Sequence, residues 1–454
     1  MLHNLPYQLV DAKLNNKTCY NSGFIRNDFD LDETDINDDY KFAIQMIESF
    51  NRNLFITGKA GTGKSTLLKF IKECTDKNFA VVAPTGLAAL NVTGQTIHSF
   101  FKFPLNVLTE KSITKFRDTE MIKALQLLII DEVSMIRADV MDAINWSLRK
   151  NREIDKPFGG VQVVLFGDLC QLPPVVKGRD MEEYFNAEFG GPYFFNAKVF
   201  DKMQLDIIEL KQVYRQKDEN FIQKLNRVRE KRIDKNLIAE LNEEFFGKTI
   251  PYNDSVMLTT TNFDANQVND AQLERLLGTE RIYNAEIVGN FPDDSFPTEM
   301  DLRLKLGAQV MLIKNDALKR WVNGSLAIIS HIGEDYIIVK LNGKNYRVEK
   351  QSWENIAFKY NPETGKIEEK VVGIFSQLPV KLAWAVTIHK SQGQTFDKVI
   401  IDFGAGAFAH GQAYVALSRC TKASGVVLTR PLKSSDFILD DRIYDVYEKF
   451  NLIN

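Results

Sequence analysis

The stretch from Gly58 to Ser65 reads GKAGTGKS and fits the pattern G-x-x-x-x-G-K-[ST] in full. It follows an apolar run (NLFITG) and opens a helical one (STLLKFIKEC), as a phosphate-binding loop requires. Its glycines let backbone N–H groups turn toward phosphate oxygens, and the helix N-terminus adds positive potential. Lys64 is expected to reach the β- and γ-phosphates, and the Ser65 hydroxyl to ligate Mg²⁺. The predicted nucleotide-binding residues of the loop are Gly58, Ala60, Gly61, Thr62, Gly63, Lys64, Ser65 and Thr66.

Two acids, Asp131 and Glu132, end the apolar run LLIID. An acid at the end of a neighbouring strand supports a Mg²⁺ ion, and a second carboxylate beside it orients or deprotonates an attacking water. Two solvated acids after a strand are the plainer interpretation, but an intact phosphate loop favours the chemical one. Both motifs predict nucleoside triphosphate binding and hydrolysis. They do not say what the hydrolysis drives, because nucleotide kinases and GTPases carry similar loops.

The stretch LFGDLCQLPPV, residues 165–175, places an uncharged polar side chain, Gln171, after a third apolar run. It either decorates a turn or faces the nucleotide, since strands of parallel sheets present their chemistry on such loops. A neutral amide accepts from an attacking water and donates to a γ-phosphate. Asp168 is expected to buttress the loop, and Pro173-Pro174 to stiffen its exit. Cys170 has no cysteine partner or nearby base in sequence, so a reactive thiol is not expected.

Along the chain, short apolar runs at 53–58, 80–84, 127–131 and 163–167 alternate with helical stretches. This alternation predicts a doubly wound parallel sheet. A second α/β core is indicated by the runs at 255–261, 398–403 and 425–429. Between them, residues 307–373 hold short alternating strands with turns such as Asn342-Gly343, which predict a small antiparallel β module. Two such cores suggest a nucleotide bound in the cleft between them, opening and closing as a motor.

The composition of the chain limits the class of protein to which it can belong. The chain has 454 residues, 44% of them hydrophobic and 26% charged, with a formal net charge of −3 and four cysteines without a C-x-x-C pair. Roughly 150 residues per domain predicts about three domains. Neither a disulfide framework nor a zinc site is expected. Without a bilayer-length apolar run or a secretory signal, we expect a soluble, intracellular protein with no membrane partner, cytoplasmic or nucleoid-associated, a nuclear or mitochondrial location being left open.

The ordered motifs GKAGTGKS, APTGLAAL…GQTIHSFF, IIDEVSM, LFGDLCQLPPV, VYRQ, TIHKSQGQTF and AYVALSR resemble those of superfamily-one helicases. More narrowly, they resemble the petite-integration-frequency ("Pif-one") family, relatives of the RecD helicases. The resemblance covers roughly residues 37–431, and residues 136–152 also resemble the family's signature stretch. It implies an ATP- and Mg²⁺-dependent DNA helicase, active as a monomer, that moves 5′ to 3′ on single-stranded DNA. Expected substrates are single-strand/double-strand junctions, duplexes and G-quadruplexes, in replication, repair, recombination or telomere-type maintenance.

The resemblance also assigns roles. Lys64 and Ser65 bind phosphates and Mg²⁺, Asp131 supports the metal, and Glu132 is the catalytic base. Gln171 senses the γ-phosphate, and Arg215 and Arg419 are arginine fingers. Further nucleotide contacts are expected from Asn37, Tyr214 and Gly393. The DNA-contact candidates are Thr85, Gly86, His98, Ser99, Phe100, Thr259, Asn262, Thr387, His389 and Lys390. For His98 a purely structural role is an equal alternative, and for Tyr214 a buried core position is.

The expected architecture is two RecA-like P-loop domains with an inserted Src-homology-three-like β-barrel. The predicted boundaries are an irregular lead-in at 1–35, a first motor domain at 36–205, a second at 206–306 and 374–454, and the barrel at 307–373. A small wedge is expected at about 102–115. The sequence departs from the family pattern at the residue that recognises the adenine base of the nucleotide. Tyr40 stands where the family usually has an adenine-reading glutamine, so Asn37 or Gln45 is expected to replace that glutamine.

Two functions from other classes compete with a helicase. A nucleotide kinase would use the same phosphate loop, but it leaves the second core and the His389-Lys390 pair unexplained. A nucleic-acid clamp that binds ATP without hydrolysing it is disfavoured by the intact Glu132. DNA-stimulated ATP turnover separates the helicase from both.

Overall fold

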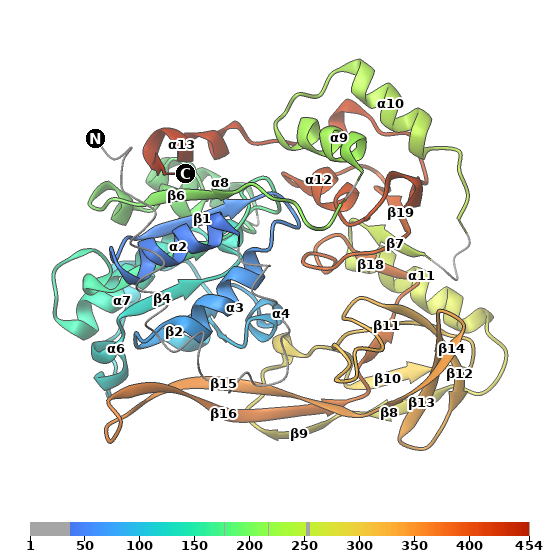
Figure 1. Ribbon diagram of the computed structural model, residues 1–454, viewed down its shortest axis with the longest axis horizontal. Helices are drawn as coiled ribbons and strands as arrows, with labels where there is room; N and C mark the ends of the chain where they lie inside the picture. Colours follow the sequence, from blue (N-terminus) through green and yellow to red (C-terminus); the bar gives the residue numbers. More distant parts are fainter. Residues whose placement is uncertain (1–36, 177, 217, 251–254, 454) are drawn as a thin grey trace.

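The first α/β core is built on a seven-stranded parallel sheet, blue to green in Figure 1 except for its C-terminal strand, which is red. The computed structural model describes residues 37–176, 178–216, 218–250 and 255–453; the lead-in predicted at 1–35 lies outside these ranges. The strands lie in the order β21 (Asn451–Leu452), β6 (Asp206–Leu210), β1 (Leu54–Gly58), β5 (Gln162–Phe166), β4 (Leu127–Ile130), β2 (Phe79–Ala83) and β3 (Gln95–Thr96). Strands β1, β4 and β5 are buried along their whole length, which explains their unbroken apolar sequences.

Helices cover this sheet and place its loops. They are α2 (Asp38–Glu48), α3 (Lys64–Cys74), α4 (Gly86–Asn91), α5 (Ile97–Phe101), α6 (Glu120–Ala124), α7 (Ala138–Arg152) and α8 (Arg179–Phe189). The loops after β1, β4 and β5 carry the phosphate loop, the acid pair and Gln171 in turn. Because β4–β5 and β5–β1 are parallel neighbours, these three loops leave the sheet at one edge.

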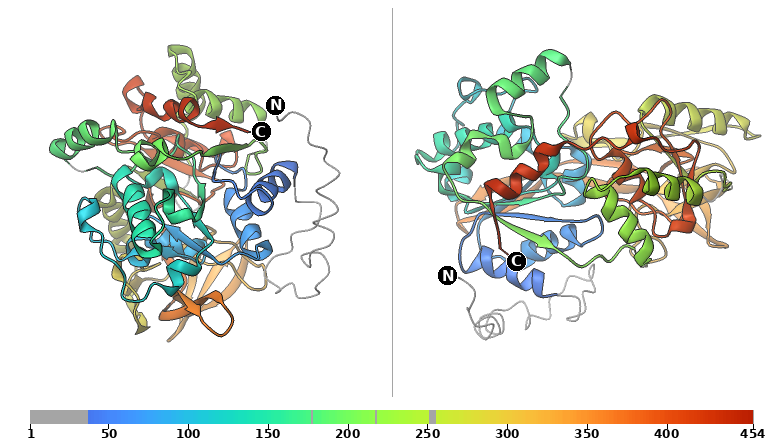
Figure 2. Two further views of the ribbon diagram at one scale, coloured as in Figure 1. Left: turned by 90° about the vertical axis from the view of Figure 1, so that its left-hand side faces the viewer. Right: turned by 90° about the horizontal axis from the view of Figure 1, so that it is seen from above.

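The second core holds a four-stranded parallel sheet in the order β18 (Ala385–Thr387), β7 (Val256–Thr259), β19 (Val399–Asp402) and β20 (Val426–Leu428). Its helices are α9 (Glu219–Arg229), α10 (Lys235–Phe245), α11 (Asn262–Arg275) and α12 (Gln412–Leu417). Seen from above, the two cores lie side by side (Figure 2). The predicted α/β class with two parallel-sheet cores is confirmed.

The inserted β module is larger than predicted. A five-stranded antiparallel sheet runs β14 (Lys344–Glu349), β13 (Tyr336–Leu341), β12 (Leu326–Ile332), β11 (Gln309–Leu312) and β17 (Val380–Leu382). Beside it lie a pair, β10 (Asp301–Leu304) with β8 (Arg281–Asn284), and a trio, β15 (Gln351–Asn361), β16 (Lys366–Gln377) and β9 (Glu286–Gly289). The module therefore occupies 281–382, and the boundaries at 307 and 373 are wrong, because β9 and β17 pair with its strands across long sequence gaps.

The boundaries of the motor domains also need correction. Strand β6, assigned to the second domain, pairs along its length with β1, and the C-terminal strand β21 pairs with β6. The chain thus returns to the first core at its end, with α13 (Asp445–Lys449) lying over that core (Figures 1 and 2). Pairing between segments some 245 residues apart leaves no local signal in the sequence, so the run at 206–210 gave no hint of its partner.

The hairpin of β15 and β16 reaches from the module to the first core, along the lower edge of Figure 1. At its tip the Asn78 side chain donates to the Gly365 carbonyl (3.0 Å), and the Lys366 amine donates to the Asp76 carbonyl (2.9 Å). Farther along, Lys72 pairs with Glu369 at 3.1 Å. The module is therefore fastened to both cores.

The loop predicted as a wedge, about 102–115, follows α5. Its tip residue Leu105 is 84% exposed, whereas Leu108 is buried and its backbone N–H donates to the Asp139 carboxylate (2.9 Å). Lys102 begins the loop in the left-handed region (φ +57°), which turns the chain out of the helix. The loop is anchored at its base with an apolar tip, and its role as a wedge stays a prediction.

Candidate nucleotide and nucleic-acid site

The phosphate loop joins β1 to α3 in the expected way. Gly61 and Gly63 have φ of +84° and +81°, a conformation that favours glycine, and a Cβ on Gly63 would lie 2.0 Å from the Tyr40 hydroxyl. The Lys64 amine donates to the carbonyls of Gly58 (2.7 Å) and Lys59 (3.1 Å), so the lysine folds over its own loop. Burial lowers the pKa of Lys64. An ammonium whose hydrogen bonds go to neutral carbonyls is suited to bind an anion.

The acid pair follows β4. Asp131 is 8% exposed, and burial together with the neighbouring Glu132 charge raises its pKa to about 7. Glu132 sits in the left-handed region at φ +48°, which a non-glycine residue adopts at a cost of order 1 kcal/mol or more. Burial raises the pKa of Glu132, while the charges of Lys64 and Arg419 act to lower it. The strained turn holds this carboxylate in the cleft, opposite the second core.

Gln171 lies on the loop after β5 and is 6% exposed. Its amide nitrogen donates to Asp168 at 3.2 Å, and Asp168 also accepts the backbone N–H of Cys170 at 3.1 Å. Arg229 of α9, in the second core, makes an ion pair with Asp168 at 3.3 Å. Burial alone would raise the pKa of Asp168, but Arg229 and Lys64 hold it below its ordinary value. The expected buttressing role of Asp168 therefore has a structural basis, and the buttress extends across the domain boundary.

The two predicted arginine fingers lie on the second-core side. Arg215 packs so closely on Gly61 that a Cβ on this glycine would lie 2.4 Å from the Arg215 Cβ. Arg419 follows α12, is 1% exposed, and donates to the Ser418 hydroxyl (3.0 Å). Burial, together with the Arg215 charge, lowers the pKa of Arg419 to about 9. Two desolvated guanidinium groups that repel each other are suited to an anionic group between the cores.

The structure adds Gln392, a residue for which the sequence predicts no role. Its amide nitrogen donates to the Glu132 carboxylate at 3.0 Å and to the Gln171 side-chain oxygen at 3.1 Å. Gln392 belongs to the second core, whereas both acceptors belong to the first. It stands beside Gly393 in TIHKSQGQTF, but that local sequence carries no signal for a partner some 260 residues away.

The residues predicted to contact the nucleotide base lie together at the end of the phosphate loop. Asn37 caps α2 by accepting the Tyr40 backbone N–H (2.9 Å), and its amide donates to the Tyr214 hydroxyl at 2.9 Å. The Tyr40 hydroxyl donates to the Gly63 carbonyl at 2.8 Å. Tyr214 is 44% exposed, so the alternative of a buried core tyrosine is wrong. Tyr40 supports the loop, which leaves Asn37 and Tyr214 available to a base.

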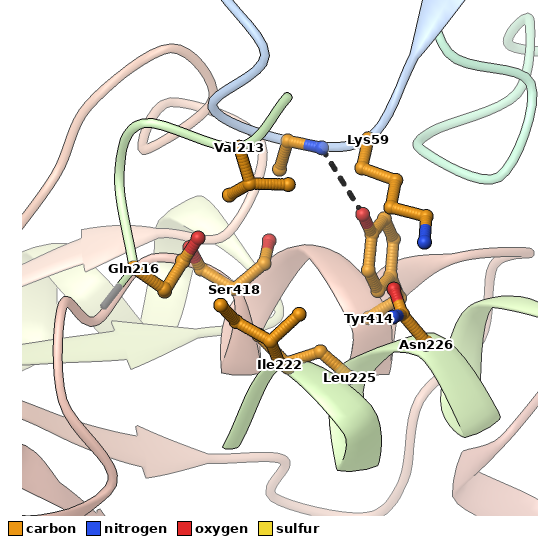
Figure 3. A pocket seen from close by; sticks show the side chains of 9 residues that line it. Lys59, Val213, Gln216, Ile222, Leu225, Asn226, Tyr414 and Ser418 are labelled. Atoms are coloured by element: carbon orange, nitrogen blue, oxygen red, sulfur yellow. Dashed lines mark hydrogen bonds between the residues drawn. The ribbon is translucent and has the colours of Figure 1, made fainter. Parts of the chain in front are cut away.

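A small pocket lies behind the phosphate loop, between the two cores (Figure 3). Its lining includes Lys59 from the first core and Ile222, Leu225 and Tyr414 from the second. The Tyr414 hydroxyl accepts the backbone N–H of Ala60 at 3.1 Å, the dashed line in Figure 3. Helix α12 thus touches the phosphate loop directly, shortly before the chain reaches Arg419.

The residues present fit a Mg²⁺ ion. The Ser65 side chain is exposed at the start of α3, and the Asp131 carboxylate is buried without a cationic partner at hydrogen-bond distance among the described residues. Mg²⁺ prefers oxygen ligands and is held by one or two protein groups plus substrate phosphates. Burial and the neighbouring Glu132 charge raise the pKa of Asp131, and a bound cation would act in the opposite direction.

The DNA-contact candidates fall into two groups on the two cores. Thr85 caps α4, accepting the Ala88 N–H at 3.2 Å, while His98 and Ser99 lie on α5. In the second core His389 stacks on Phe408 (ring centroids 6.3 Å apart), Lys390 is exposed, and Asn262 is exposed at the start of α11. Burial lowers the pKa of both His98 and His389, which favours the neutral form of these rings.

Three candidates need correction. Phe100 is 4% exposed and packs on Phe101 and Phe358, so its ring offers no surface for stacking a base in this arrangement. Thr259 and Thr387 are 1% and 4% exposed, and they are register partners in β7 and β18. The Thr259 hydroxyl donates to the Thr261 carbonyl, and that of Thr387 accepts the Lys390 N–H. These threonines shape their loops, since short hydroxyls cap adjacent backbone groups more readily than they reach outward.

Comparison with known proteins gives one consistent result. The sequence model of a family described as PIF1-like helicase matches residues 35–238. An ATP-dependent DNA helicase PIF1 from Emericella nidulans is 32% identical over 459 residues, covering 86% of this chain and 60% of the relative. A Bacteroides sp. Pif1 solved with ADP-AlF4 is 36% identical and superposes with a TM-score of 0.84, covering 92% of this chain and 99% of that one.

A second structure of Bacteroides Pif1, bound to single-stranded DNA, is 37% identical and covers 91% of this chain and 96% of that one, with a TM-score of 0.65. The chain spans about three fifths of the length of the curated relatives from Emericella nidulans and Danio rerio. Among the helices described, none has the length and apolar character needed to span a membrane.

Proposed function

The chain belongs to the PIF1-like helicase family, and we propose that it is an ATP-dependent DNA helicase whose two α/β cores hydrolyse ATP between them and move along single-stranded DNA. The observation that carries the proposal is the contact of the second core with the catalytic carboxylate. Gln392 touches Glu132, Arg215 packs on Gly61 of the phosphate loop, and the Arg419 charge acts on Glu132. Closure around ATP would complete a site that neither core holds alone.

In the proposed reaction, Lys64 leaves the Gly58 and Lys59 carbonyls and binds the β- and γ-phosphates. Ser65 and Asp131 would hold a Mg²⁺ ion, whose charge offsets that of the phosphates. Glu132 takes the proton from the attacking water, and Gln171 holds that water against the γ-phosphate. Arg215 and Arg419 stabilise the charge that develops on the transferred group. Asn37 and Tyr214 hold the base.

The proposed partner is single-stranded DNA and its junctions with duplex. It would lie over the exposed ends of α4, α5 and α11 and over Lys390, where hydroxyl and basic groups of both cores gather. Support comes from Bacteroides Pif1, solved with single-stranded DNA. Movement 5′ to 3′, action on G-quadruplexes and activity as a monomer belong to this proposal through family membership.

The test measures ATP turnover with and without a single-stranded oligonucleotide, followed by unwinding of 5′-tailed and 3′-tailed duplexes. We expect strong stimulation, and unwinding of the 5′-tailed duplex alone. Equal turnover with and without DNA would contradict a motor, and transfer of phosphate to a nucleoside would restore the kinase alternative.

For the role of Gln171, the Gln171→Ala variant is expected to bind nucleotide and DNA yet lose most stimulated turnover and unwinding.

A further inference from the structure

The catalytic cleft contains a side chain in an unexpected place. Hydrolysis needs a water that donates to Glu132 and is held by Gln171. In the structure both acceptor atoms, the Glu132 carboxylate oxygen Oε2 and the Gln171 oxygen Oε1, accept from one nitrogen, Nε2 of Gln392, at 3.0 and 3.1 Å. An amide –NH2 has two hydrogens, so this nitrogen satisfies both acceptors with the donor pattern of a water molecule.

We propose that Gln392 is a positioning residue whose side-chain amide occupies the place of the attacking water when DNA is absent. DNA binding then withdraws this amide. This inference rests on the proposed function. It supplies a physical reason for low turnover without DNA: the base and the water-holding amide are both engaged by a group that cannot react.

The link to DNA is the turn that carries Gln392. The Ser391 N–H donates to the Thr387 carbonyl (3.0 Å), and the Gln392 N–H donates to the His389 carbonyl (3.2 Å). Residues 387–392 are therefore a string of tight turns leaving β18, with Lys390 exposed on its outer side. Lys390 is free to meet a phosphate, and a shift of this compact turn moves Gln392 with it. One segment thus connects the DNA side to the water position.

The test compares Gln392→Ala with Gln394→Ala. Gln394 lies two residues along the same loop, and its buried side-chain oxygen has no hydrogen-bond partner among the described residues, so its removal takes no hydrogen bond from Glu132 or Gln171. We expect Gln392→Ala to raise DNA-free kcat by about tenfold with the KM for ATP unchanged, as expected for loss of a contact to a charged group. Turnover at saturating DNA should change little, so the stimulation ratio falls. Gln394→Ala should match the natural protein.

A second measurement uses no turnover. If DNA must break these contacts, their removal strengthens nucleotide-free binding of a fluorescent oligo-dT by a similar factor, because coupling between two sites is reciprocal. Loss of a merely structural contact would not raise either quantity. A conservative variant, Gln392→Asn, keeps the amide on a stem one carbon shorter and should fall between the two alanine variants.

The outcomes are distinct. If the natural protein shows no DNA stimulation, the proposed function fails. If the natural protein is stimulated but Gln392→Ala has DNA-free kcat and DNA affinity no higher than Gln394→Ala, only the water-replacement proposal is overturned. A lower DNA-free kcat in Gln392→Ala would assign Gln392 a direct supporting role in hydrolysis. That result would equally overturn the water-replacement proposal.

Discussion

At the scale of single residues, the site depends on a strained carboxylate. Glu132 is held at φ +48° beside a buried aspartate, an arrangement with a conformational cost that a purely structural turn would not need. We predict that Glu132→Gln keeps nucleotide affinity within a few-fold but lowers DNA-stimulated turnover by at least about 100-fold, the usual contribution of a general base. Phosphate release and binding of a fluorescent ATP analogue measure the two effects. Turnover close to that of the natural protein would remove Glu132 from its role as base.

A second residue-scale prediction concerns the buried pair of Arg229 and Asp168. Both side chains are less than a tenth exposed, and Arg229 also approaches Glu209 at 3.6 Å. Because Arg229→Met leaves the Asp168 charge buried without its main partner, we expect a loss of about 3 kcal/mol in unfolding free energy. Asp168→Asn combined with Arg229→Met should recover part of that loss. Urea unfolding of the four proteins in the cycle tests this, and additive single effects would show that the two charges are not coupled.

At the scale of elements, the loop between β19 and α12 is fixed against the Gln171 loop by a buried histidine. His410 donates from Nε2 to the Leu169 carbonyl (2.8 Å) and accepts the Asp440 N–H at Nδ1 (2.9 Å), so the ring must be neutral. Gly411 then lies so close that a Cβ would be 2.4 Å from the Cys170 carbonyl oxygen. This contact fixes the position of α12, and with it Arg419, relative to Gln171.

Burial lowers the pKa of His410, although Asp440 and Asp168 act to raise it, and the Tyr193 ring packs on its side. Because the pKa is lowered, the unfolded chain binds the proton more tightly than the folded chain. The contribution of the neutral His410 ring to folding stability is therefore complete above the ordinary histidine pKa and is lost as pH falls through the lowered value. We predict that the melting temperature of His410→Gln, whose amide can both donate and accept, declines less between about pH 7.5 and pH 5.5 than that of the natural protein. Parallel declines would exclude His410 as the cause.

At the scale of the whole molecule, the sequence predicts what is local and leaves out what joins distant segments. The phosphate loop, the acid pair and Gln171 each follow a buried strand, so the strand pattern alone placed them at one sheet edge. Three other features depend on how the parts of the molecule dock: the pairing of β21 with β6, the contacts of the β15–β16 hairpin with Lys72 and Asn78, and the contact of Gln392 with Glu132. Docking is decided by shape and charge over hundreds of residues, so no short pattern carries it.

The same docking covers part of the expected DNA path. The turn η8 (Asp293–Ser295), which follows β9, lies against α4 so closely that a Cβ on Gly86 would be 2.2 Å from the Ser295 hydroxyl oxygen. The Asp294 charge acts on His98, one of the DNA-contact candidates. Two exposed carboxylates therefore stand where a sugar–phosphate backbone is expected.

We predict that Asp293→Asn combined with Asp294→Asn strengthens binding of a single-stranded oligonucleotide by about three- to tenfold at low salt, because two like charges no longer oppose the phosphates. The matched control is Glu334→Gln with Asp335→Asn, which removes the same charge from an exposed turn between β12 and β13. Fluorescence anisotropy at two salt concentrations measures both variants. Equal gains would mean that only net charge matters, whereas a gain confined to the η8 variant would mean that these two carboxylates lie beside the bound phosphates.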